Sequence, residues 1–284
     1  MVGQSCIWHN WFIRKCHIIY TVYVSILFYN KSILCLTVSM PNNNSPSGAQ
    51  IQIVTLNLFR FEKYQQIWAF LMMGLARFGL KKVENLEFWK LFGSGTGEGF
   101  TPIPNFSVYG LLCVWESEAA ARNALLNDRV FKKYLSRASH TSTIFMKPVS
   151  SRGYWSGSQP FIAKEEKPKE FIAVLTRATV KWSKLKSFWR EAPDISNRIG
   201  TDKNVMFKIG LGEVPIRQQL TFSIWKNLSH MKKFAHQAGS HKDAILKVRE
   251  GDWFSEELYA RFNVIEVKGN FSEFNQKKQE LMNE

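Results

Sequence analysis

FSVYGLLCVW (residues 106–115) decides the fold of this chain, because a segment of the same kind, RQQLTFSIW (residues 217–225), follows it further along. Both segments are rich in β-branched and aromatic residues, as strands are. Each ends on a tryptophan, Trp115 in the first and Trp225 in the second. A repeat over this distance predicts that the chain contains two units of similar construction.

The sequence on either side of these segments gives the same order of elements twice: a strand, a helix, two strands, a helix and a strand. We expect strands at 51–59, 88–98, 106–115 and 142–149 in the first unit, and at 171–180, 205–213, 217–225 and 259–267 in the second. This order is typical of the ferredoxin-like unit, an antiparallel sheet with helices on one face. We therefore predict an α+β fold of tandem ferredoxin-like βαββαβ units, which pack their bare sheet faces together as a pseudo-symmetric dimeric α/β barrel.

The domain boundaries follow from this repeat and from changes in composition. We expect a leader at 1–39, a flexible N-terminus at 40–50, the first unit at 51–150, a linker at 151–170, the second unit at 171–274 and a polar tail at 275–284.

The leader differs from the rest of the chain. Residues 1–39 hold three of the four cysteines and no acidic residue. Their apolar run, 18–29, is shorter than the roughly 20 residues of a membrane-spanning helix. A hydrophobic anchor and a signal peptide are both open interpretations, but we favour a third, in which Met40 is the true start of the protein.

The chain is strongly basic, with a formal net charge of +15 over 284 residues. Without Arg14, Lys15 and Lys31 of the leader the charge is still +12. Such a charge suits an anionic membrane surface, an acidic protein or nucleic acid, but the basic residues are dispersed, which argues against nucleic acid. Outside the leader Cys113 is the sole cysteine, which excludes a disulfide framework and a cysteine-based metal cluster.

A glycine-rich stretch, GSGTGEGFTPIPN (93–105), raises the possibility of a phosphate-binding loop. The Walker motif has a lysine and a serine or threonine after its last glycine, whereas Glu98, Gly99 and Phe100 occupy these places here. We interpret the stretch as a turn between two strands. Glu98 and Glu213 then occupy matching turns, and we expect both to act as structural caps.

The repeat also singles out one histidine. When Trp115 is aligned with Trp225, His241 falls where the first unit has Phe131. Ser240 is a good N-cap, which would place His241 in the first turn of a helix. On these residues alone an exposed or hydrogen-bonded histidine is favoured over a metal ligand. The sequence has no HExxH motif and no histidine and cysteine cluster of the kind that binds zinc.

Seven segments together resemble the spheroidene monooxygenase family of carotenoid biosynthesis, over about residues 51–271. They are KLFGSGTGEGFTPIPN, SSRGYWSG, LTRATV, FWREAPDIS, NVMFKIGLGEVP, QLTFSIW and VREGDWFSEELYARF. The resemblance implies a monooxygenase that oxidises the C-2 position of an acyclic carotenoid with dioxygen to a hydroxy or keto product. It also implies haem as the cofactor and a donor such as reduced ferredoxin.

The resemblance assigns roles to particular residues. It makes His241 the favoured haem ligand, since oxygen activation needs a redox centre and haem needs an axial ligand. Arg177 would anchor a haem propionate or polarise bound oxygen, with an ion pair at the rim as its alternative. Lys208 has the same two interpretations. Five residues would line an apolar substrate channel, although aromatic side chains at such spacings also suit a core: Arg152, Trp155, Trp253, Phe254 and Tyr259.

A carotenoid is dissolved in the bilayer, so we expect a cytoplasmic enzyme that is peripheral on the inner face of the cell membrane. Its positive charge would favour anionic lipid and an acidic ferredoxin. Two other classes of function stay open. One is a cofactor-free enzyme of the same architecture, and the other is a non-catalytic module that binds an apolar ligand.

Overall fold

The computed structural model describes residues 51–97, 99–163, 168–191, 202–214, 216–236 and 251–270. The predicted leader at 1–39, the segment 40–50 and the tail at 275–284 lie outside the described residues. So do Glu98 and the predicted helix start at Ser240 and His241.

The described residues contain eight strands, one for each predicted strand and within a few residues of the expected bounds. They are β1 (Ile53–Arg60), β2 (Leu86–Gly95), β3 (Pro104–Trp115), β4 (His140–Gly153), β5 (Ile172–Val180), β6 (Val205–Val214), β7 (Gln218–Trp225) and β8 (Phe254–Gly269). The strand β4 is longer than predicted and runs into the stretch expected to be linker.

Helices connect the strands on the outside of the sheet. They are the short 3₁₀ helix η1 (Lys63–Gln65), α2 (Gln66–Leu80), α3 (Glu118–Asn127), α4 (Arg129–Leu135), the 3₁₀ helix η2 (Trp182–Lys184) and α6 (Leu228–His236). The Ser117 side chain accepts a hydrogen bond from the Ala120 N–H, and Asp128 accepts one from Val130. These two N-caps satisfy free N–H groups and fix where α3 and α4 begin.

The strands form one closed antiparallel barrel in the order β1-β3-β2-β6-β7-β5-β8-β4. The two halves of the chain meet at two seams. The seam between β4 and β8 is long, from Ser142↔Gly269 to Gly153↔Leu258, whereas the seam between β2 and β6 has only the pairs Gly93↔Gly212 and Ser94↔Leu211. The short seam leaves most of β2 without a strand partner on that side.

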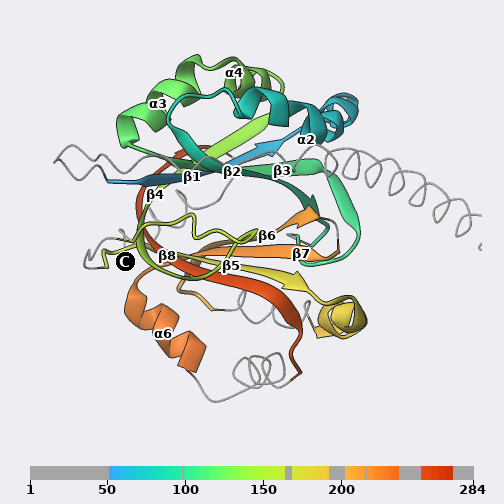
Figure 1. Ribbon diagram of the computed structural model, residues 1–284, viewed down its shortest axis with the longest axis vertical. Coiled ribbons are helices and arrows are strands. Elements are labelled where there is room, and N and C mark those ends of the chain that lie inside the picture. The colour runs from blue at the N-terminus through green and yellow to red at the C-terminus, as the bar shows by residue number, and fades with distance from the viewer. Residues whose placement is uncertain are drawn as a thin grey trace, which may run out of the picture. The chain divides into compact units, whose positions relative to one another are not determined.

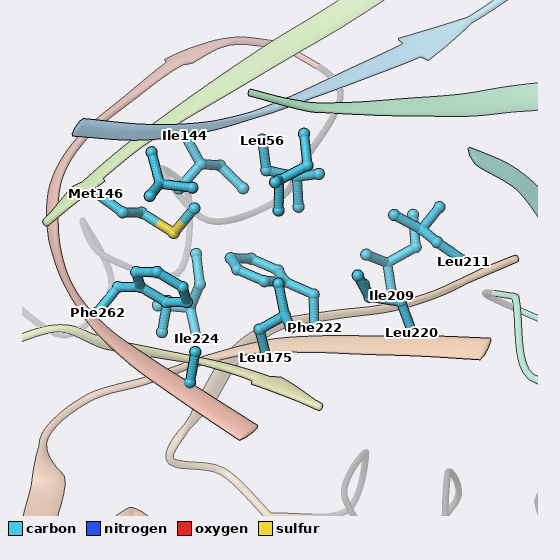
Figure 2. Close-up of a cluster of buried hydrophobic side chains, with 14 of the residues drawn as sticks. Leu56, Ile144, Met146, Leu175, Ile209, Leu211, Leu220, Phe222, Ile224 and Phe262 are labelled. Carbon is cyan, nitrogen blue, oxygen red and sulfur yellow. The ribbon is translucent and has the colours of Figure 1, made fainter. Parts of the chain in front are cut away.

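The barrel interior is the main core. Alternate side chains of the strands point inward and pack with one another, as Figure 2 shows for Leu56, Ile144, Leu175, Phe222 and Phe262, among others. These five side chains are fully buried. The interior is therefore filled by the protein's own side chains over this region, as in other small barrels.

Helices cover the barrel on two sides (Figure 1). The layer of α2, α3 and α4 lies over the first half, where Tyr134 packs on Phe59 with ring centroids 4.9 Å apart. On the other side α6 packs on the second half, where Phe234 lies 5.0 Å from Trp225. No helix in the part of the chain that the structure describes is long and apolar enough to cross a bilayer.

The two tryptophans that introduced the repeat hold matching places. Trp115 at the end of β3 pairs with Ile53 at the start of β1, and Trp225 at the end of β7 pairs with Ile172 at the start of β5. The antiparallel barrel with helices outside it is thus established. The relation of the two halves as repeated ferredoxin-like units stays a prediction.

Candidate functional site

Arg177 points into the barrel. Its neighbours at two-residue spacing on β5, such as Leu175, belong to the interior core, and its own side chain is 1% exposed. Its guanidinium forms an ion pair with Glu256 of β8, and its Nη2 lies 3.8 Å from Oε2 of Glu213 on β6. The alternative of an ion pair thus describes Arg177 well, with the guanidinium buried and the Glu256 side chain 24% exposed.

Lys90 completes this arrangement from the other half of the chain. It lies two residues from both Phe88 and Phe92 on β2 and so shares their face of the strand, and both phenylalanines pack into the interior core. Its Nζ lies 2.6 Å from Oε1 of Glu213. The bond joins β2 to β6 near the short seam. We call Lys90, Arg177, Glu213 and Glu256 the interior charge cluster. Our prediction of Glu213 as a turn cap was wrong, because Glu213 lies on β6 and contacts two cations.

Trp155 covers the interior charge cluster. The residue is fully buried, and its Nε1 donates a hydrogen bond of 2.8 Å to Oε2 of Glu213. Its ring lies 5.8 Å from the Arg177 guanidinium. The following turn contributes two backbone donors to Glu256, from Ser156 at 3.0 Å and from Gly157 at 2.8 Å. Trp155 was predicted within a linker and a substrate channel, and the structure places it inside the barrel core.

The protonation of Glu256 follows from these contacts. Burial raises the pKa of its carboxyl group, but the N–H groups of Gly157 and Ser156 and the charge of Arg177 together lower the pKa below its ordinary value. The carboxylate is therefore ionised at neutral pH. The interior charge cluster contains two cations and two carboxylates and is therefore formally neutral. Proteins tolerate buried charges when they are paired in this way.

Two nitrogen atoms of the Arg177 guanidinium lack hydrogen-bond acceptors among the described residues. They are Nε and Nη2, and both are buried. A buried donor without an acceptor costs about 1–3 kcal/mol. Arg177 nevertheless does not fit the expected role of a propionate anchor, because Glu256 and Glu213 already face its guanidinium and would repel a further anion.

Lys208 lies on the other side of the barrel wall. Its neighbours Phe207 and Ile209 pack toward the interior core, so the Lys208 side chain points outward. Its Nζ lies 5.4 Å from the centroid of the Phe100 ring. The structure therefore does not bring Lys208 together with Arg177.

Phe100 belongs to the glycine-rich loop, which packs against β6. Gly99 has a φ of +91°. A Cβ atom added to Gly210 would lie 2.6 Å from the Gly99 carbonyl oxygen, so the two backbones approach too closely for side chains. The prediction of a turn between two strands is confirmed for the described part of the loop, and the glycines serve this close approach.

The outer faces of the two halves differ at matching ladder positions. In the first half the pair Phe59↔Tyr109 is 2% and 4% exposed, and the matching pair in the second half is Ala178↔Gln219. The next outward pair of the second half is Thr176↔Thr221, with both side chains half-buried. The second half thus presents smaller and more polar side chains. We call Thr176, Ala178, Lys208, Gln219 and Thr221 the second outer face.

The other predicted channel residues are not gathered in one channel. Arg152 pairs with Tyr259 across β4 and β8, with the guanidinium 5.9 Å from the ring, and both side chains are exposed. Trp253 and Phe254 lie half-buried at the start of β8, where Phe254 is 6.3 Å from Phe188. Tyr259 alternates with Leu258 of the core, and it therefore points away from Trp155.

No group of three or more metal-binding side chains occurs within the described ranges. Of the histidines there, His140 is exposed, and His230 lines a pocket of about 260 Å3 with Lys203 and Lys233. This volume is below the range of about 300–1,000 Å3 that is typical of small-molecule sites. Burial raises the pKa of Cys113, which disfavours the thiolate that would bind iron.

Comparison with known proteins identifies the family. The chain is 43% identical to the spheroidene monooxygenase of Cereibacter sphaeroides over 78% of its length and 69% of that protein. It is 41% identical to the spheroidene monooxygenase of Rhodobacter capsulatus over 77% of its length and 92% of that protein. The chain belongs to the spheroidene monooxygenase family. The expected family resemblance is thereby confirmed.

No family model matches this member of the spheroidene monooxygenase family. Among solved structures, an aldoxime dehydratase in complex with butyraldoxime covers 86% of the chain and 92% of its own length, with a TM-score of 0.54 and 9% identity. At this identity the likeness concerns the fold alone.

Sequence reasoning missed three of the four members of the interior charge cluster. Lys90 could have been identified from the sequence, because a lysine between Phe88 and Phe92 on an apolar strand needs a carboxylate partner. Glu256 has no such signal, since the register of β8 against β5, which brings Glu256 near Arg177, has no local sign in the sequence.

Proposed function

We propose that this chain is a carotenoid monooxygenase that oxidises the C-2 position of an acyclic carotenoid to a hydroxy or keto product. The single observation that carries the proposal is the identity of 41–43% to two spheroidene monooxygenases over most of the chain. Hydroxylation of a C–H bond consumes dioxygen, two electrons and two protons, and releases water. A ferredoxin-like protein is the proposed source of the electrons.

Haem is the proposed cofactor, with His241 as its ligand. When bound, haem supplies the oxygen activation that side chains cannot provide. The support is the family resemblance, since His241 lies outside the described residues and Arg177 does not fit a propionate. We therefore assign Arg177 to the ion pairs of the interior charge cluster.

We propose the second outer face as the surface at which the reaction takes place. The described barrel interior is packed with side chains, which leaves little room for a long apolar substrate (Figure 2). The second outer face instead has small side chains and the outward-pointing Lys208. The segment that carries His241 connects α6, which packs on this side of the barrel, to β8. The positive charge of Lys208 would orient an anionic or oxygen-bearing group here.

Activity is the direct test. Full-chain protein, an acyclic carotenoid in detergent micelles, reduced ferredoxin and dioxygen should yield a hydroxy or keto carotenoid by liquid chromatography and mass spectrometry. Lys208→Met should lower turnover without changing the melting temperature, whereas Lys203→Met, an exposed lysine outside the second outer face, should leave turnover unchanged. Unchanged substrate under these conditions would refute the proposal.

The cofactor has a separate test. Protein purified after expression with haem supplied should show a Soret band. His241→Ala should remove or shift the band, and His140→Ala, at an exposed histidine of β4, should not. A colourless, folded wild-type protein would contradict the haem assignment and favour a differently equipped enzyme of the same fold.

A further inference from the structure

Helix α2 and the preceding η1 present a row of large apolar side chains to solvent. Tyr64, Ile67, Leu71, Leu75 and Phe78 are 79%, 75%, 49%, 58% and 64% exposed. They recur every three or four positions, so they share one face of the helix. We call these five residues the α2 stripe. The opposite face packs inward through Ala69, Met72, Met73, Ala76 and Leu80.

This exposure is unusual for a helix on the surface of a folded domain. Such a helix ordinarily has an apolar face toward the core and a polar face toward water. Here both faces are apolar. Phe70 extends the apolar surface toward Phe106, with ring centroids 6.1 Å apart. A contiguous exposed apolar patch of this kind marks an interaction surface rather than ordinary surface.

Within the helix the charges beside the stripe are basic, and the nearest acidic residues in the sequence are the exposed Glu62 and Glu84 that flank it. Residues 63–82 contain four basic residues and no acidic residue. Lys63 lies at one end of the stripe and Lys81 and Lys82 at the other, and all three side chains are exposed. Helix α4 lies in the same outer layer as α2 (Figure 1) and adds exposed Lys132 and Lys133.

We propose that the α2 stripe docks this protein on the surface of an anionic lipid bilayer. Apolar side chains along one helix face, with lysines beside them, are the pattern of a helix that lies in the membrane interface. The lysines would contact lipid headgroups while the stripe enters the acyl boundary. A second copy of this chain is a poorer partner, because two such faces would bring lysines against lysines.

The inference rests on the proposed function in one respect: a lipid-dissolved substrate gives the enzyme a reason to bind a bilayer. The residues of the surface are independent of that function. Docking through α2 would hold the first half of the barrel against the membrane.

The test compares two variants of the full chain by sedimentation with vesicles of phosphatidylcholine alone or mixed with phosphatidylglycerol. The stripe variant is Ile67→Ser/Leu71→Ser/Leu75→Ser/Phe78→Ser. The control is Leu126→Ser/Ile162→Ser, at apolar residues that are 70% and 62% exposed outside the stripe. We expect the stripe variant to lose at least about tenfold in partitioning to anionic vesicles, since binding scales with buried apolar area, and the control to bind as wild type.

A local readout separates α2 from the apolar run of the leader. Hydroxyl-radical footprinting of wild type should show Tyr64 and Phe78 protected by anionic vesicles and Leu126 unprotected. A Lys81→Gln/Lys82→Gln variant should bind less strongly and with less preference for anionic lipid. Circular dichroism checks that each variant is folded, which is expected because the altered side chains are exposed.

Three results would overturn the proposal: equal binding of the folded stripe variant and wild type, no protection of Tyr64 and Phe78, or a wild-type dimer that the stripe substitutions dissociate. The proposed function fails separately. A stripe variant that loses vesicle binding should still oxidise a carotenoid in detergent, and wild type that binds vesicles through α2 but oxidises no carotenoid would refute the function and leave the docking surface intact.

Discussion

Replacing Arg177 by methionine should destabilise the protein strongly. Methionine is of similar length and can occupy the apolar part of the space. The substitution leaves Glu256 without its cation. It also removes one of the two cations that lie near Glu213. Removal of one partner of a buried ion pair costs about 3–5 kcal/mol.

The structure places the expected loss at the lower end of this range. Glu256 is 24% exposed and keeps its two backbone hydrogen bonds, and Glu213 keeps Lys90. We therefore expect Arg177→Met to lower the free energy of unfolding by about 3 kcal/mol. The matched control is Arg152→Met, where an exposed arginine lies 5.9 Å from the Tyr259 ring, and its loss should be about 0.5 kcal/mol.

Urea denaturation at neutral pH measures both values. A double variant, Arg177→Met/Glu256→Gln, extends the test, because it removes the carboxylate that the first substitution leaves unpaired. Its destabilisation should be about 1–2 kcal/mol smaller than the sum of the two single losses. A loss below about 1 kcal/mol for Arg177→Met, or additive single losses, would refute the view that Arg177 and Glu256 form a stabilising ion pair.

Three further predictions concern the same region. The folded-state pKa of Glu256 lies below its ordinary value of 4.5, so its stabilising contribution is complete above that value and is lost as the pH falls through the lowered pKa; Glu256→Gln should flatten the acid limb of stability against pH, and an unchanged limb would contradict the pairing. Trp155→Phe should lower the unfolding free energy by about 1–3 kcal/mol in urea titrations, because the Glu213 carboxylate loses a buried donor, and a loss within error of zero would argue against the bond. Gly99→Ala should lower the melting temperature, because its backbone meets Gly210 and has a positive φ, whereas Gly93→Ala should be tolerated, since no atom lies within 4 Å of its added Cβ; equal effects would show that the close approach is not required.

The strands could be predicted from the sequence because each has a local signal. The tryptophans at the ends of β3 and β7 fixed the register of the repeat, and each pairs with the first residue of a strand, as a repeated construction requires. The length of β4 was missed because SSRG looks like a linker. Its extension depends on pairing with β8, which is more than 100 residues away in the sequence.

The candidate site was less accessible. Arg177 was identified, but its carboxylate partners lie on other strands, β6 and β8, and the strand register that brings them to Arg177 has no local signal in the sequence. Trp155 was assigned to a channel because an aromatic residue in a glycine-containing segment has no local sign of burial. Lys208 and Arg177 were grouped because both interrupt apolar strands, yet alternation along β5 and β6 places them on opposite faces of the wall.

The most direct measurement of the central claim is the origin of the oxygen atom in the product. Full-chain protein would be incubated with an acyclic carotenoid, reduced ferredoxin and isotopically labelled dioxygen, and the hydroxy product analysed by mass spectrometry. The account predicts one labelled oxygen atom at C-2 of the carotenoid. An unlabelled hydroxyl group, or no product from a folded protein under turnover conditions, would contradict monooxygenase activity on this substrate.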